Sequence, residues 1–163
     1  MPKTANPEGK TLDRIDRQIL RCLQDNARQS ITSLASEVGL SQTPCADRVR
    51  ALEASGIIEG YHARVSPARL GLELMVFVEI SLQRTAPDVF EEFRTAVLAL
   101  PQLLECHLVS GNFDYLIKAR VADMAAYRKL LGETILLLPG VSESRTYVVM
   151  EEVKESNILP IRG

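Results

Sequence analysis

Apolar side chains in the first third of the chain recur every three or four positions, with polar residues between them. This spacing predicts three short helices, each with one buried face. The first helix covers residues 12–26, and its buried stripe consists of Leu12, Ile15, Ile19 and Leu23. The second begins after Ser30 and ends at Gly39, because serine caps helix starts and glycine tolerates the left-handed conformation of many helix ends. Its buried face consists of Ile31, Leu34, Ala35 and Val38.

The third predicted helix begins after Ser41, another potential N-cap, and ends at Gly56. Pro44 falls in its first turn, where the missing backbone N–H does not interrupt the helix. Its buried stripe consists of Cys45, Val49 and Leu52. Helices joined by a tight glycine-containing turn are typical of a helix-turn-helix, which is therefore the predicted architecture of this part of the chain.

Beyond residue 57 the helical period gives way to short apolar runs and alternating positions. Residues 57–61 predict a short strand or wing, and Pro67–Gly71 a connector. The later pattern predicts strands at 74–83, 104–110, 115–121 and 145–153, and helices at 88–100 and 124–138. Their order is βαββαβ, the split βαβ or ferredoxin-like unit. The predicted fold class is α+β, with an N-terminal (winged) helix-turn-helix and a C-terminal ferredoxin-like domain.

These elements divide the chain into five parts. Residues 1–11 are expected to form a flexible tail, and residues 158–163 a C-terminal tail. The helix-turn-helix domain covers residues 12–66, a linker covers 67–73, and the βαββαβ domain covers 74–157. A length of 163 residues is compatible with two small domains.

The first predicted strand alternates between two kinds of side chain. One face of the sheet, which includes Val76, Val78 and Ile80, is expected to pack on the two helices. The other face still carries apolar residues and would be left open. Because an open apolar face is a liability on a small domain, the pattern predicts that this face meets a second subunit in a dimer.

Composition and charge change this picture little. The chain is 46% hydrophobic and 25% charged, as is normal for a soluble globular protein, and no apolar run reaches the roughly 18 residues of a membrane span. The net charge is −2, but residues 1–70 carry +2 and residues 71–163 carry −4, so a small basic excess lies in the helical part. Cys22, Cys45 and Cys106 have neither zinc-site nor disulfide spacing and are expected to be buried, reduced thiols.

The outer face of the third predicted helix is the candidate DNA-binding surface. Gln42 at its N-terminal end could pair with adenine, and Arg50 could contact guanine or phosphate. Arg48 suits a phosphate contact. Ser41 and Thr43 could serve backbone phosphates, helped by free N–H groups at the helix start, although capping is the main role expected of Ser41. Asp47 is expected to pair with an arginine of the same helix, although outer-face residues are also often merely solvated. The candidate DNA-binding residues are Ser41, Gln42, Thr43, Pro44, Ala46, Asp47, Arg48 and Arg50.

At this point the sequence resembles the Lrp/AsnC family over almost its whole length, from about Leu12 to Asn157. The N-terminal part resembles it in the segments LDRIDRQILRCLQDNAR and LASEVGLSQTPCADRVRALEASGIIEGYHA. The C-terminal part does so in VFVEISLQRTAPDVFEEF, ECHLVSGNFDYLIKARV, MAAYRKLLGETILLLPGV and SRTYVVMEEVKESN. The chain departs from the family at Ser33, where a glutamate often completes the cap of the second helix, and at Asn112, where an aspartate is frequent.

The resemblance implies a transcription regulator of amino-acid metabolism genes, able to activate some and repress others. It implies double-stranded DNA as a partner, and homodimers that form through the C-terminal domains and assemble into tetramers, octamers or larger particles. An amino acid bound between dimers is the implied effector, with leucine favoured and no other cofactor. The implied location is the cytoplasm of a bacterium, in association with the nucleoid and not with a membrane.

The resemblance also implies where the effector binds: the turn between the second and third C-terminal strands, the following helix and the last strand. The implied residues are Leu108, Gly111, Asn112, Asp114, Met124, Leu136, Tyr147, Val148 and Val149. An amino-acid zwitterion needs an acceptor for its ammonium group, which Asp114 could supply, and donors for its carboxylate, which backbone N–H groups near Gly111 could supply. The alternatives are that Asp114 caps the turn and that the apolar residues belong to the core or an interface.

Two other functions stay open from the sequence. The chain could be a local regulator of one catabolic operon that answers to another amino acid, such as proline or lysine. It could also be an architectural protein that condenses DNA with little ligand response. An enzyme is disfavoured, because His62 and His107 are far apart in sequence and no nucleophile–base pair, metal spacing or phosphate-binding glycine loop is present.

Overall fold

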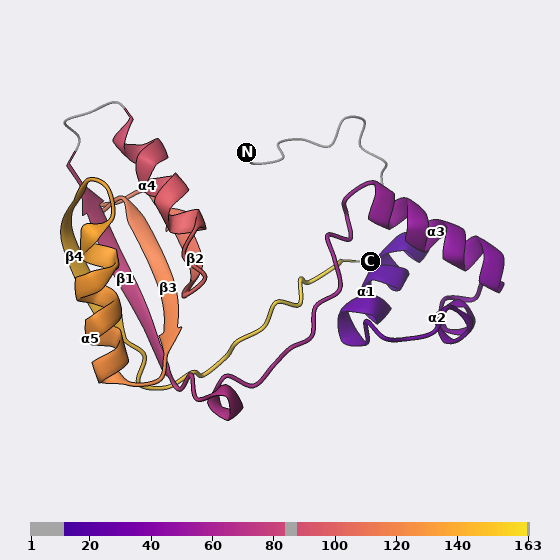
Figure 1. Cartoon of the computed structure of the whole chain (residues 1–163). Coiled ribbons are helices and arrows are strands. Elements are labelled where there is room, and N and C mark those ends of the chain that lie inside the picture. Colours follow the sequence, from indigo (N-terminus) through magenta and orange to yellow (C-terminus); the bar gives the residue numbers. More distant parts are fainter. Residues whose placement is uncertain (1–11, 84–87, 163) are drawn as a thin grey trace. The chain divides into compact units, whose positions relative to one another are not determined.

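The computed structural model describes residues 12–83 and 88–162, which form two compact units (Figure 1). The N-terminal unit comprises Met1–Arg64 together with Glu155–Gly163, and the C-terminal unit comprises Val65–Lys154. The expected flexible tail lies outside the described residues. The end of the chain was expected to be a tail after the second domain, whereas its described residues belong to the N-terminal unit.

Three helices form the N-terminal unit, as predicted: α1 (Arg14–Asp25), α2 (Ile31–Val38) and α3 (Gln42–Ala54). Asp13 caps α1, because its Oδ1 accepts a hydrogen bond from the Asp16 backbone N–H at 2.8 Å. The Ser30 hydroxyl caps α2 in the same way and accepts from the Ser33 N–H at 3.1 Å. The turn between α2 and α3 begins at Gly39, which adopts the left-handed conformation with φ +72°.

The predicted buried stripes meet in one core between the three helices. Ile19 of α1, Leu34 of α2 and Cys45 of α3 are fully buried there. Leu12, Ile15 and Leu23 pack against this core but are only partly buried, as expected for the rim of a small helical domain. The sequence pattern therefore predicted both the helices and the sides that they bury.

The segment predicted as a short strand or wing does not form a strand. Residues 57–61 follow α3 without any strand assignment, and the next regular element is a short 3-10 helix at Ala68–Leu70. Instead, the Tyr61 hydroxyl donates a hydrogen bond back to Glu53 of α3 at 2.9 Å. A strand needs a partner for its backbone groups, and the described residues offer none to this segment.

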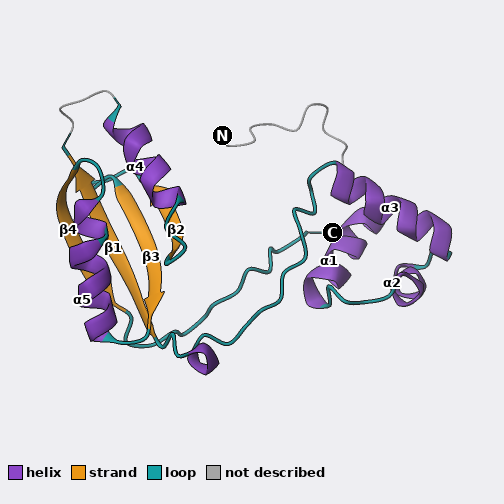
Figure 2. Ribbon diagram, viewed as in Figure 1, coloured by secondary structure: helices purple, strands orange, loops and turns teal. Residues whose placement is uncertain are grey.

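Four antiparallel strands form the sheet of the C-terminal unit: β1 (Leu74–Leu82), β2 (Leu103–Leu108), β3 (Tyr115–Val121) and β4 (Val141–Val148). Their order across the sheet is β2-β3-β1-β4. Two helices, α4 (Val89–Leu98) and α5 (Met124–Glu133), cover one face of it (Figure 2). The predicted βαββαβ order is confirmed.

Two elements differ most from their predicted bounds. The helix expected at 124–138 stops at Glu133, and a 3-10 helix, Ile135–Leu137, follows. The last strand was expected at 145–153 but begins at Val141, directly after Gly140, whose φ of +73° turns the chain into the sheet. Because β4 is an edge strand with many exposed side chains, its first residues are polar and resemble a loop in sequence.

The sheet face away from the helices is far more polar than expected. Alternate residues of β1 and β3, among them Val78 and Ile117, are buried on the helical side. On the other side Lys118 forms an ion pair with Glu105 at 3.0 Å, and Arg120 pairs with Glu152 at 2.5 Å. The face also carries Phe77, Leu116 and Tyr147. The expected apolar residues are therefore present on this face, but charged side chains with their own partners occupy much of it.

Candidate functional site

The start of α3 presents unused hydrogen-bond donors at an exposed position. Ser41, Gln42, Thr43 and Pro44 are all exposed. Ser41 occupies the N-cap position, but its hydroxyl makes no cap hydrogen bond, contrary to the expectation that capping is its main role. The first N–H groups of a helix have no partner within the helix, and Pro44 has no backbone N–H group. The N–H groups of Gln42 and Thr43 can therefore serve an anion such as a phosphate.

The outer face of α3 carries an ion pair between Arg50 and Asp47. The expected pairing within the helix is therefore confirmed. The Arg50 side chain is 69% exposed, so it can turn from Asp47 to another anion at little cost. Ala46 lies beside this pair and is half-buried. Arg50 is thus the α3 arginine that faces solvent.

Arg48 makes a contact within the N-terminal unit that the sequence did not predict, and its expected phosphate contact stays a prediction. Its Nη1 lies 2.7 Å from Asp13 Oδ2 and 2.7 Å from Asp16 Oδ1, and the Asp16 side chain is 3% exposed. Hydrogen bonds to these two carboxylates raise the pKa of Arg48 further, with the bond to Asp16 as the larger cause. Arg48 therefore joins α3 to the start of α1 and is a positioning residue.

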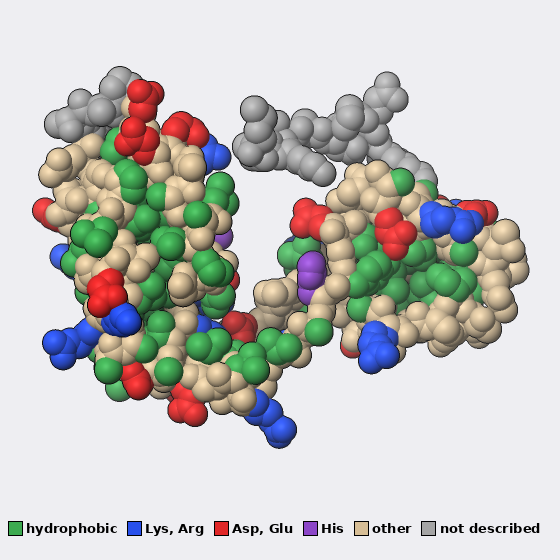
Figure 3. All heavy atoms as spheres, viewed as in Figure 1, with side chains coloured by type: hydrophobic (Ala, Val, Ile, Leu, Met, Phe, Trp, Pro, Cys, Tyr) green, Lys and Arg blue, Asp and Glu red, His purple; other side chains and the backbone are tan. Residues whose placement is uncertain are grey.

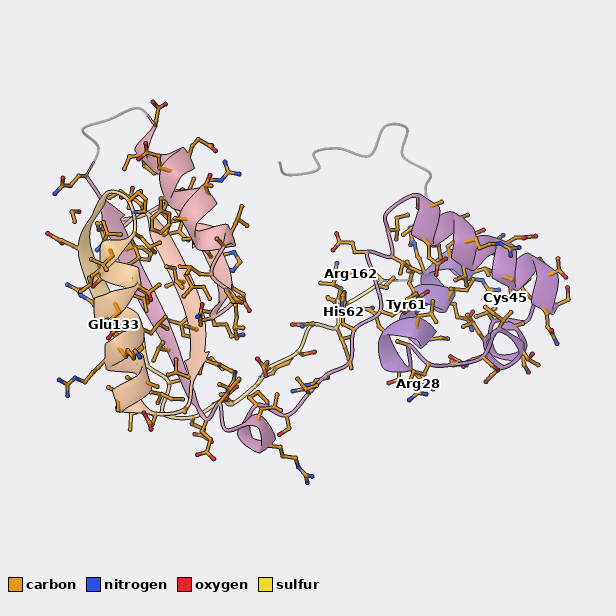
Figure 4. All side chains as sticks on the ribbon, in the orientation of Figure 1. Arg28, Cys45, Tyr61, His62, Glu133 and Arg162 are labelled. Atoms are coloured by element: carbon orange, nitrogen blue, oxygen red, sulfur yellow. The ribbon has the colours of Figure 1, made fainter. Side chains whose placement is uncertain are left out.

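Sequence reasoning missed this link between α1 and α3, although one signal was available. Asp16 lies next to Ile15 and three residues before Ile19, on the stripe that the helical period marks as buried. A carboxylate on a buried stripe requires a cationic or hydrogen-bonding partner, which here is Arg48. Cys45, which is labelled in Figure 4, lies in the first turn of α3 and is fully buried in the core.

The apolar residues of the implied effector site are exposed in a single chain. Exposed large hydrophobic residues include Leu108 at the end of β2, Met124 at the start of α5, Leu136, Tyr147 and Val148. Figure 3 shows hydrophobic side chains exposed among charged ones over the visible side of the C-terminal unit. A pocket that receives an apolar side chain should shield it from water, and these residues do not form such an enclosure alone.

The sheet order separates these residues into two groups. Leu108 belongs to β2 at one edge, whereas Tyr147 and Val148 belong to β4 at the other. With neighbouring strands about 4.8 Å apart, the two edges lie roughly 14 Å from each other. Val149 follows β4, and its N–H donates to Met75 O at 3.0 Å. A single chain therefore does not bring the implied effector residues around one amino acid.

Asp114 is already engaged within the C-terminal unit, and its expected contact with the ammonium group of a ligand stays a prediction. Asp114 is 7% exposed, and its Oδ2 accepts a hydrogen bond from the Leu82 N–H at 2.8 Å. Its own N–H donates to Ile80 O at 2.9 Å. These bonds hold the end of β1, where the pairing of β1 with β4 shifts register between Ser81 and Leu82. Asp114 thus has the turn-stabilising role that the sequence left as an alternative.

The turn before Asp114 is the part of the implied site that stays accessible. Gly111 and Asn112 are exposed, and a Cβ added at Gly111 would meet no atom within 4 Å. Beyond the turn, the buried Tyr115 hydroxyl has no hydrogen-bond partner among the described residues. Its ring lies 4.5 Å from that of Phe93, and burial raises the pKa of its hydroxyl.

Other chemistries find no support in the described part of the chain. Residues 12–83 and 88–162 contain no cluster of three or more histidine, cysteine or acidic side chains that could hold a metal ion. No helix within these ranges is long and apolar enough to cross a membrane. The cysteines are free thiols, and Cys22 and Cys45 are buried as expected, whereas Cys106 is only partly buried.

Comparison with known proteins assigns both units. Residues 12–59 match the family model described as winged helix-turn-helix DNA-binding, and residues 75–159 match the Lrp/AsnC ligand binding domain. The leucine-responsive regulatory protein of Escherichia coli K12 is 63% identical over 154 residues, which cover 94% of each chain. The protein of the same name from Serratia marcescens is equally similar.

Solved structures agree over the whole fold. A transcriptional regulator from Neisseria meningitidis, solved in complex with L-Met, superposes with a TM-score of 0.88 at 36% identity, covering 92% of this chain and 97% of that one. An AsnC family regulator from Agrobacterium tumefaciens gives 0.86 at 32% identity, covering 91% and 96%. These relatives are transcription regulators and not enzymes. A DNA-binding domain and an amino-acid-binding domain in this order make the chain a DNA-binding transcription regulator, and it belongs to the Lrp/AsnC family.

Proposed function

We propose that the chain binds specific DNA sites through α3 and that leucine, or a similar apolar amino acid, controls this binding by changing the assembly of chains. The observation that supports it best is the separation of the implied effector residues to opposite edges of one sheet. Such residues form one site only when chains associate. A ligand in that site would stabilise the assembly that creates it, by its differential affinity for the two states.

The exposed apolar residues fit this proposal. Leu108, Met124 and Leu136 are available both for contacts between chains and for an apolar side chain of the effector. The polar sheet face, with the Lys118–Glu105 pair, suits a dimer interface in which charges fix the register. Dimers would then assemble into tetramers, octamers or larger particles. The protein would act in the bacterial cytoplasm, associated with the nucleoid.

Assembly would control DNA binding through the number of α3 helices that reach DNA at once. Linked binding modules raise the effective concentration of each other, so that modest affinity per helix becomes tight binding to several sites. In the proposed contact the start of α3 meets phosphate, and Gln42 and Arg50 read bases. Arg48 is left out of direct base reading because the two α1 carboxylates hold it.

Arg50→Ala should weaken binding to the preferred DNA about ten- to one-hundred-fold, the usual cost of one arginine contact to a base. The loss has two causes: the cation disappears, and Asp47 keeps its negative charge facing the phosphates without its partner. Fluorescence anisotropy with a duplex that the protein itself enriches from a random pool measures the change.

Arg128→Ala removes an exposed arginine of the C-terminal unit and serves as the matched control, with no more than a small change. Sedimentation of Arg50→Ala should equal that of the parent chain. An Arg50→Ala protein with full DNA affinity, or with altered assembly, would show that Arg50 is not a DNA contact.

Millimolar leucine should shift the sedimentation coefficient of the full chain between two assembly states. Glycine is the control, because it carries the same charged groups without an apolar side chain. A shift with glycine as large as that with leucine would argue against an apolar pocket. No shift with leucine but one with proline or lysine would favour the local regulator, and no shift with any amino acid would favour the architectural protein.

A further inference from the structure

The described end of the chain packs against the first helix of the N-terminal unit. Gln24 of α1 holds the backbone of Leu159 from both sides: its Nε2 donates to Leu159 O at 3.1 Å, and its Oε1 accepts from Leu159 N at 2.7 Å. This is the pairing that one residue of a neighbouring strand would make. Figure 1 shows the C-terminal segment ending at the helices of the N-terminal unit.

Two further contacts extend this docking along α1. Ile161 is partly buried and packs against the core of the three helices. Arg17, seven residues before Gln24 and thus two helical turns away on the same side, donates from Nη1 to Arg162 O at 3.3 Å. Arg162 is labelled in Figure 4. Hydrogen bonds to Leu159, apolar packing of Ile161 and a hydrogen bond to Arg162 therefore follow one another along four consecutive residues.

An ion pair marks where the segment enters the N-terminal unit. Arg64 Nη2 lies 3.8 Å from Glu155 Oε2. Arg64 ends the first stretch of the N-terminal unit, and Glu155 begins the second. The pair therefore joins the two stretches of chain that connect this unit to the rest of the protein. Both side chains are well exposed, so the pair contributes little affinity and serves mainly to align the stretches.

We infer that α1 is a docking surface for an extended peptide and that its occupant is the C-terminal segment Ile158–Arg162 of the same chain. While the segment is docked, the chain connects the two units at two places, after Arg64 and before Glu155. When the segment is released, only the connection after Arg64 holds the N-terminal unit. The contacts are few, and Leu159 is itself 71% exposed, so docking is reversible. Shortening or freeing a tether changes the effective concentration at which a linked module meets its target.

This inference can be tested without DNA or amino acid, so its failure is separate from a failure of the proposed function. The full chain is treated with carboxypeptidase, and loss of the last residues is followed by mass spectrometry. Gln24→Ala removes both hydrogen bonds to Leu159 and leaves the tail sequence unchanged. Trimming should become about ten-fold faster, as expected when about 1 to 2 kcal/mol of hydrogen bonding is lost.

Gln18→Ala is the matched control. Gln18 lies on the same helix and donates to a backbone carbonyl, that of Glu37 at 3.1 Å, on another side of α1. The trimming rate of the Gln18→Ala protein should equal that of the parent chain. A second measurement follows amide hydrogen exchange of the peptide containing Leu159, which should speed up in Gln24→Ala only.

Equal trimming and exchange in Gln24→Ala and the parent chain would overturn the inference. Protection that rises with protein concentration would also overturn it, because the occupant of α1 would then be the tail of a second copy. Protection that is independent of concentration and lost in Gln24→Ala would establish docking within one chain.

Discussion

Gly140→Ala is expected to lower the free energy of unfolding of the C-terminal unit by about 3 kcal/mol, the sum of a left-handed backbone and an overfilled core. Gly140 has φ +73°, and a Cβ there would lie 2.0 Å from Val89 Cγ2. Val89 opens α4 and is itself buried, so it has little room to move. Gly140 also accepts a hydrogen bond from Gln83 N at 2.8 Å, so a shift of this turn would disturb the junction of β1 and β4.

Gly71→Ala separates the two causes. Gly71 has almost the same backbone angle, φ +69°, but a Cβ there would meet no atom within 4 Å. It should therefore cost only the conformational part, about 1 kcal/mol. Urea unfolding of both variants at one fixed protein concentration measures the difference, since assembly affects apparent stability. If Gly140→Ala cost no more than Gly71→Ala, the close approach of Val89 would not matter for stability.

Glycine turns of this kind were among the features that the sequence predicted well. Gly39 was predicted to end α2 and Ser30 to begin it, and both do so with the expected conformation and hydrogen bond. The reason is that helix caps act within four residues, so the signal and its effect lie together in the sequence. The βαββαβ order was predicted for the same reason, since hydrophobic period is a local property.

Features that depend on distant partners were predicted poorly. The expected wing at residues 57–61 has strand-forming residues but no partner strand. The start of β4 was missed because its polar residues form a strand only by pairing with β1, more than fifty residues earlier. The hydrogen bond that the Asp114 carboxylate accepts from the Leu82 N–H, far away in sequence, was not foreseen. Periodicity along the chain carries no information about such pairings.

The two candidate sites differ in the same way. The proposed DNA-binding surface lies on one helix, so the outer position of Arg50 and its pairing with Asp47 followed from spacing alone. The implied effector residues come from several elements, and the sheet order places Leu108 and Tyr147 at opposite edges. Their role stays a prediction, and so does the second chain that would complete the proposed site. One residue of α3, Arg48, is also held by ion pairs with residues that are distant in sequence.

Arg48→Met should therefore destabilise the N-terminal unit by about 2 to 3 kcal/mol and weaken DNA binding, because α3 loses its link to α1. Asp16 would be left almost fully buried without its cation, which is the costly half of breaking a buried ion pair. The expected loss lies at or below the lower end of the usual cost of breaking a buried ion pair, because Arg48 itself is 32% exposed. Arg50→Ala is the contrasting control: it should lose DNA affinity while the thermal midpoint of the unit stays nearly unchanged.

The double variant Asp16→Leu, Arg48→Met gives the sharper test, because replacing a buried pair by apolar residues is often neutral in stability. It should recover most of the lost stability, and any DNA binding that returns with it would show that Arg48 acts by holding α3 and not by touching phosphate. A stable double variant that does not bind DNA would show that Arg48 acts by touching phosphate.

Acid unfolding provides an independent measurement of the same contact. The Asp16 N–H, and then Arg48, hold the pKa of Asp13 below its ordinary 3.8. A lowered pKa means that this carboxylate stabilises the fold fully above the ordinary value and loses that contribution as the pH falls through the lower, folded-state value. Without Arg48 the folded pKa moves back toward 3.8. In Arg48→Met the contribution of Asp13 is therefore smaller at neutral pH and depends less on pH. Because this variant starts from a lower stability, it should begin to unfold at a higher pH than the parent chain, whereas Arg50→Ala should follow the parent curve.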